Sequence, residues 1–164
     1  MTLMDQKKTA FMGLFAAAAI ILGYVESLIP FFVGIPGIKL GLANLAVLFI
    51  LEKYTWKEAA LVSVVRILVL GFLFGNMFSI LYSLAGAALS LAVMTFMQKK
   101  SGFTVMGISV SGGVSHNIGQ LAVAALIVEN FGVLYYAPVL LVSGVITGLL
   151  IGFLTQEVLK RVRL

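Results

Sequence analysis

The chain has 164 residues, of which 62% are hydrophobic and only 10% are charged, and its net charge is +5. A soluble domain has about a quarter of its residues charged, so this composition excludes a soluble monomer and indicates an integral membrane protein. The sequence holds no cysteine and a single histidine, which argues against a zinc or two-metal site. Because a membrane-crossing helix needs roughly 20 residues, we expect one all-α domain, 1–164, built as a bundle of six transmembrane helices.

Six apolar stretches separated by polar or glycine-containing turns are the predicted spans. Thr55, followed three residues later by Glu58, predicts a capping box that opens the third span. The second span is short for a full crossing, and the proline- and glycine-containing outer segment 31–38 would have to supply the rest. The predicted spans are 9–29, 39–51, 55–74, 77–97, 105–128 and 135–159.

The cations predict how the chain lies in the membrane. With six spans, nine of the eleven Lys and Arg residues fall in four segments on one face, at 7–8, 53–57, 99–100 and 160–163. The positive-inside rule makes this face cytoplasmic, with both termini inside. Anionic lipid headgroups then account for the positive charge, and nucleic acid is not expected as a partner.

Two cations lie outside this belt. Arg66 falls near the middle of the third span, and Lys39 begins the second span on the outer side. An ionisable group inside a membrane segment points to a partner or a functional site. Three interpretations stay open: a structural salt bridge from Arg66 to Glu26 in the first span, an anion site at Arg66 or Lys39, or snorkelling without a specific partner.

The fifth span carries the histidine in the run His116-Asn117-Ile118-Gly119-Gln120. His116 and Gln120 are one helical turn apart, and Ser109, Gly112 and Gly113 continue the same face. This face is either a helix contact or a cavity wall, since small residues favour close helix packing whereas three large polar groups in hydrocarbon need partners. Together with other polar groups of the spans, we expect a pocket that opens outward. The candidate ligand-binding residues are Lys39, Asn44, Arg66, Asn76, Tyr82, His116, Asn117 and Gln120.

Small residues also line the first span. Gly13 and Ala17 lie four residues apart, as do Ala19 and Gly23. Such a face lets another helix approach closely. It fits packing within the chain and docking to a separate membrane subunit equally well, so these four residues are the candidate docking residues.

The sequence contains no pattern for enzyme chemistry. There is no phosphate-binding loop, nucleophile elbow, HExxH or DDxxD motif, and Asp5 is the only aspartate. Diphosphate chemistry assisted by a metal needs clustered carboxylates, so we expect no catalytic residue, no metal and no cofactor. Any active transport would have to be energised by a partner or an ion gradient.

Three stretches carry a family resemblance: 35–44 (IPGIKLGLAN), 81–86 (LYSLAG), and 107–109 (GIS) leading to 116–120 (HNIGQ). They resemble the bacterial family called Gx transporter or heptaprenyl diphosphate synthase component I. The overall plan is also similar to the substrate-binding S components of energy-coupling factor vitamin transporters, whose docking face is an alanine-x-x-x-alanine pattern.

The two resemblances imply different functions in a bacterial cytoplasmic membrane. S-component likeness implies that a small molecule, anionic or amphipathic, is captured from outside and delivered with a transmembrane coupling protein and two ATPases. The synthase name implies a non-catalytic accessory subunit that works with a soluble prenyl diphosphate synthase subunit in quinone side-chain synthesis. Because the chain offers polar groups and two non-cytoplasmic cations but no carboxylate cluster, its residues favour the binding and transport interpretation. A purely structural membrane subunit is a third possibility.

Overall fold

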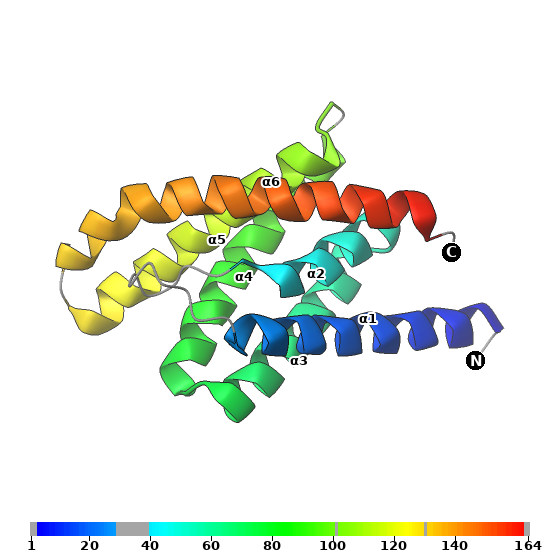
Figure 1. The fold of residues 1–164 in the computed structure, drawn as a ribbon, viewed down its shortest axis with the longest axis horizontal. Helices are drawn as coiled ribbons and strands as arrows, with labels where there is room; N and C mark the ends of the chain where they lie inside the picture. The colour runs from blue at the N-terminus through cyan, green and yellow to red at the C-terminus, as the bar shows by residue number, and fades with distance from the viewer. Residues whose placement is uncertain (1–2, 29–39, 101, 130, 163–164) are drawn as a thin grey trace.

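The computed structural model describes residues 3–28, 40–100, 102–129 and 131–162, and within them the chain is helical with no strand (Figure 1). Six α-helices and one short 3-10 helix follow one another along the chain. They are α1 (Leu3–Leu28), α2 (Leu42–Lys53), α3 (Trp56–Phe74), α4 (Met77–Lys99), α5 (Val105–Val128), η1 (Phe131–Tyr136) and α6 (Ala137–Arg161).

Four segments of the described chain are long and apolar enough to cross a membrane: 6–28, 77–99, 105–128 and 132–161. Of the six expected spans, those of α1, α4, α5 and α6 are therefore supported by length and composition. With 12 residues, α2 reaches about 18 Å, which is shorter than a hydrocarbon core of about 30 Å. The 19 residues of α3 include three charged side chains, Lys57, Glu58 and Arg66.

The short helix α2 forms the centre of the bundle. Residues 46–51 are all buried, and Phe49, Ile50 and Leu51 have no exposed surface. A helix that is apolar on every side must be enclosed, and α2 packs against α1, α3 and α6. Figure 1 shows it between α1 and α6. This enclosure places the first turn of α2, with its polar Asn44, inside the bundle.

Glycines let α5 pack closely against α4 and α6. A Cβ on Gly148 of α6 would lie 2.6 Å from the Val110 Cα, and one on Gly144 would lie 3.0 Å from the Gly113 carbonyl carbon. On the other side, a Cβ on Gly119 would lie 2.9 Å from the Ala85 carbonyl oxygen of α4. Such backbone approach is typical of membrane helix pairs. The glycines of α5 therefore allow close helix packing, and Gly112 and Gly113 of its small-residue face also line cavities.

Polar contacts gather the cation-bearing helix ends at one end of the bundle. The predicted capping box between Thr55 and Glu58 at the start of α3 is confirmed. The Lys8 Nζ of α1 lies 2.5 Å from a Glu58 carboxylate oxygen, and the Gln98 amide of α4 donates to the Leu51 carbonyl of α2 at 2.8 Å. The hydrogen bonds from Lys8 and then from Thr55 lower the pKa of Glu58 from 4.5 to about 2. The beginning of α1 and the end of α6 lie at this same end (Figure 1).

Helix boundaries agree closely with the sequence in α3, α4 and α5 and less closely elsewhere. The predicted range 105–128 is the observed α5. The sixth span was expected from Tyr135, but residues 131–136 form η1 and α6 begins at Ala137, with Pro138 in its first turn. The irregular outer segment 31–38 and Lys39 lie outside the described residues.

Candidate ligand-binding site

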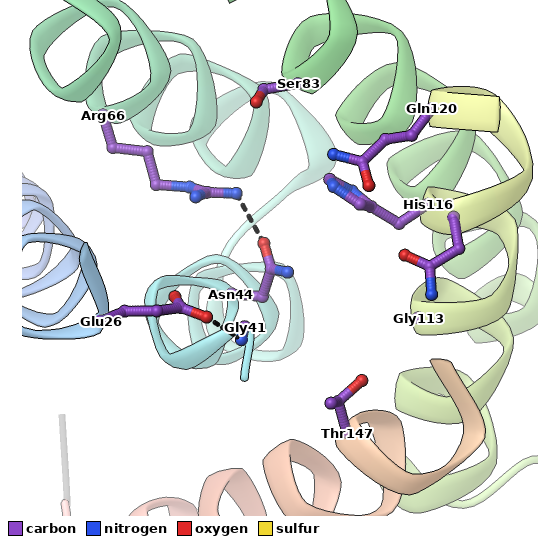
Figure 2. A pocket seen from close by; sticks show the side chains of 10 residues that line it. Glu26, Gly41, Asn44, Arg66, Ser83, Gly113, His116, Gln120 and Thr147 are labelled. Atoms are coloured by element: carbon purple, nitrogen blue, oxygen red, sulfur yellow. Dashed lines mark hydrogen bonds between the residues drawn. The ribbon is translucent and has the colours of Figure 1, made fainter. Parts of the chain in front are cut away.

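A polar cavity lies inside the bundle, between the ends of α1 and α2 and the middle parts of α3, α4, α5 and α6 (Figure 2). Its volume is about 70 Å³, room for a group as large as about two water molecules. Ten residues line it: Glu26, Gly41, Asn44, Arg66, Ser83, Gly113, His116, Asn117, Gln120 and Thr147. Five of the eight predicted ligand-binding residues therefore meet at one cavity.

Arg66 of α3 is the cation of the cavity. Its Nη2 donates to the Asn44 Oδ1 of α2 at 2.5 Å, and Figure 2 shows the guanidinium extended towards Asn44. The Arg66 Nε is buried and makes no hydrogen bond to a described residue. A guanidinium carries five N–H donors, so one amide oxygen satisfies only a small part of its capacity. The guanidinium thus retains donors for an oxygen-rich ligand group.

Glu26 of α1 has a structural role at the beginning of α2. Its Oε1 accepts a hydrogen bond from the Gly41 backbone N–H at 2.5 Å. Gly41 is the N-cap of α2 with a φ of 75°, a conformation that glycine adopts without strain. A carboxylate at a helix N-terminus is also favoured by the helix dipole. The same carboxylate also acts electrostatically on Arg66. This geometry is compatible with a structural role of Glu26 at the start of α2 and with an anion site at Arg66.

His116 and Gln120 of α5 reach the cavity from the side opposite Glu26, and Figure 2 shows both side chains pointing towards Asn44 and Arg66. Gln120 is 3% exposed. Gly86 of α4 makes room for them, because a Cβ there would lie 2.7 Å from the Gln120 Cγ and 3.0 Å from the His116 Nε2. The position of these two polar side chains therefore depends on a glycine of the neighbouring helix.

Asn117 joins α5 to α6 as well as lining the cavity. Its Nδ2 donates to the Leu140 carbonyl at 2.6 Å and to the Ser143 Oγ at 3.3 Å. Thr147, one turn after Ser143, also lines the cavity and donates to the Ser143 carbonyl at 2.9 Å. Sequence reasoning missed Thr147, although the polar and small positions 143, 144, 147 and 148 mark one face of α6.

Two other predicted site residues, Asn76 and Tyr82, do not line the cavity. Asn76 is exposed and caps α4 by accepting from the Ser79 backbone N–H at 2.8 Å. Tyr82 stacks with Phe78, with ring centroids 5.9 Å apart. Lys39 belongs to the residues that the structure does not describe.

The four predicted docking residues of α1 divide into two pairs. Gly13 and Ala17 are exposed, and nothing lies within 4 Å of a Cβ built on Gly13. Ala19 and Gly23 are buried, and a Cβ on Gly23 would meet the Leu70 side chain of α3 and the Ala43 Cβ of α2. The second pair therefore packs within the chain, whereas the first pair faces outward.

The donors of the cavity suit an anion. Arg66 supplies a positive charge with several N–H groups, Asn44, His116 and Gln120 add further polar atoms, and Glu26 is the one carboxylate among the described lining residues. Within the described ranges, no three His, Cys, Asp or Glu side chains gather as metal ligands would. The fold and cavity define a helical, membrane-type protein with an internal polar site.

Comparison with known proteins identifies the family. The model of the family described as heptaprenyl diphosphate synthase component I matches residues 15–158, so the chain belongs to that family and the suspected resemblance is confirmed. No curated protein and no solved structure matches the chain. All ten residues of the cavity fall inside the matched range.

Proposed function

We propose that this chain is a membrane substrate-binding protein whose internal cavity holds the anionic group of a small molecule. The observation that carries the proposal is the Arg66 guanidinium, which faces a polar cavity inside an apolar bundle with its Nε unbonded. The Glu26 carboxylate lines the same cavity and acts electrostatically on Arg66, and a bound anion would supply acceptors to the guanidinium donors that Asn44 leaves unused.

The other lining residues have distinct proposed roles. Asn44 holds the guanidinium in place through its 2.5 Å hydrogen bond. His116 and Gln120 orient the ligand by hydrogen bonds, and Asn117 contributes mainly by joining α5 to α6. Lys39, at the outer start of the second predicted span, would attract the anion from outside, and Asn76 and Tyr82 would act nearer the outer surface.

The proposed setting is the bacterial cytoplasmic membrane, with both termini inside. Lys8, Glu58 and the helix ends around them would then lie on the cytoplasmic side. In the transport role, the exposed Gly13 and Ala17 would dock a coupling membrane protein that works with ATPases.

A second candidate role follows from the family description. As component I of a heptaprenyl diphosphate synthase, the chain would be an accessory membrane subunit of a soluble prenyl diphosphate synthase subunit. Purification of the intact chain from its own membrane separates the roles. Co-purification with a coupling membrane protein and ATPases supports transport, whereas co-purification with a soluble, aspartate-rich prenyltransferase supports the accessory role and contradicts transport.

Titration calorimetry of the chain in lipid nanodiscs tests the binding site itself. The probes are inorganic phosphate, diphosphate and acetate. We expect at least one of them to bind the wild type and to bind the variant Arg66→Met about 10- to 100-fold more weakly, the loss expected for a hydrogen-bonded charge pair. Arg161→Met is the matched control, because the Arg161 side chain is 82% exposed at the end of α6. Equal weakening in both variants would overturn the assignment of Arg66.

A further inference from the structure

A second cavity adjoins the polar one. Gly41, Asn44, Gly113 and Thr147 line both cavities, so the two spaces meet at these residues. The further lining of the second cavity is mostly apolar or small and comes from Leu40, which precedes α2, and from α2, α4, α5 and α6. These residues are Leu40, Leu48, Ser90, Met94, Ser109, Gly112, Gly148 and Ile151.

The second cavity lies closer to the cation-bearing end of the bundle than the first. On α4 it is lined by Ser90 and Met94, whereas the polar cavity is lined by Ser83, which is nearer the other end of this helix. On α5 the order is the same, with Ser109 and Gly112 preceding His116 from that end. A molecule that filled both spaces would therefore extend along the helix axes from the charged group at Arg66 towards Met94.

We infer that the ligand is a short amphipathic anion, with its charged group at Arg66 and a narrow apolar group in the cavity lined by Met94. This inference rests on the proposed function and names the substrate class of the same site. The cavity volume of about 30 Å³ accommodates about one water-sized group, so the apolar part is short. Its chemistry is that of a monoalkyl phosphate or a short fatty carboxylate.

Met94 and Gly112 set the length of the apolar group. Met94 is 6% exposed, and its flexible side chain lines the cavity. A Cβ on Gly112 would lie 2.5 Å from the Met94 Sδ and 2.7 Å from its Cγ, so Gly112→Ala forces the methionine to move. Conversely, Met94→Ala removes about three heavy atoms of side chain and lengthens the space.

A series of linear monoalkyl phosphates, titrated into the intact chain in nanodiscs, tests this inference. For the wild type, we expect affinity to rise about fourfold per methylene for the first one or two carbons, as burial of apolar groups predicts, and then to level off. Met94→Ala should move the levelling point to chains about three carbons longer, while Gly112→Ala should remove the gain. Each variant's affinity for inorganic phosphate, which has no alkyl chain, is the reference for its own series. Met77→Ala is the matched control, because Met77 is 64% exposed at the start of α4.

The outcomes separate this inference from the proposed function. Phosphate binding without any gain from the alkyl chain, or a levelling point that Met94→Ala leaves in place, would overturn the amphipathic ligand and leave the anion site intact. Failure of inorganic phosphate, diphosphate, acetate and every alkyl phosphate to bind a stably folded wild type would overturn the proposed function. Repeating the series in nanodiscs with anionic lipid distinguishes two sources of the ligand. If the lipid competes with the alkyl phosphates, the site binds a lipid headgroup, and if it does not compete, the site binds a soluble molecule.

Discussion

The pair Arg66 and Glu26 provides a quantitative test, because the anion site and a structural salt bridge predict different double mutants. In our account, Glu26→Gln keeps an acceptor for the Gly41 N–H and loses the charge-assisted part of that 2.5 Å hydrogen bond, about 1 kcal/mol, together with its electrostatic effect on Arg66. Arg66→Met loses the bond to Asn44, again about 1 kcal/mol, and leaves no cation without a partner.

A salt bridge whose main role is structural would behave differently. Each single substitution would leave one charge uncompensated, at a cost of about 3–5 kcal/mol for a buried pair, and the double substitution would recover most of the loss. Thermal unfolding of the four proteins in the same detergent measures this coupling. We expect losses that are small and nearly additive, and recovery of several kcal/mol in the double variant would refute the reasoning.

Binding gives an independent measure on the same four proteins. We expect Glu26→Gln to bind inorganic phosphate as well as or better than the wild type, because local negative charge is removed, whereas Arg66→Met and the double variant bind at least about 10-fold more weakly. A double variant with wild-type affinity would exclude Arg66 as the anion site, and that role would then move to Lys39.

Three further predictions concern the bundle. The pKa of Glu58 is lowered in the folded chain to about 2, so the stability that its carboxylate provides is complete above about pH 4.5 and is lost as the pH falls towards 2. Lys8→Met should reduce this pH dependence of stability by no more than about 1 kcal/mol, because the Lys8 side chain is 43% exposed. Identical acid unfolding curves for the wild type and Lys8→Met would contradict this prediction. Gly148→Leu should separate α5 from α6, because even a Cβ at this position would lie 2.6 Å from the Val110 Cα. We expect it to lower the unfolding temperature far more than a substitution at an exposed position does. An unchanged unfolding temperature would contradict the close packing. A cysteine at Lys100 should be labelled only from the cytoplasmic side and one at Glu129 only from outside, and labelling of both from the same side would contradict the proposed topology.

Local features of the fold were predictable from the sequence because they depend on neighbouring residues. The capping box at Thr55 follows from a three-residue spacing, and the ends of α5 follow from polar and glycine residues next to an apolar run. The enclosure of α2 was not predictable in the same way. Its apolar sequence fits a short span and a buried helix equally well, and only the packing of α1, α3 and α6 around it distinguishes them.

The candidate site was predictable in its residue types and less so in its partners. Arg66, His116 and Gln120 stood out because polar groups are costly in an apolar segment. The hydrogen bond from Arg66 to Asn44 joins residues 22 positions apart, and sequence alone offered Glu26 as the partner. Likewise, the sequence gives no sign that Gly86 makes room for His116 and Gln120, because that role depends on how α4 crosses α5.

Native mass spectrometry of the chain purified from its own host membrane tests the central claim most directly. We predict that the wild type retains a small anionic molecule through detergent extraction and that Arg66→Met, purified in parallel, loses it while Arg161→Met keeps it. Equal occupancy of the wild type and Arg66→Met, or a wild type that carries no small molecule and takes up no added phosphate, would contradict the claim that this cavity is an anion-binding site.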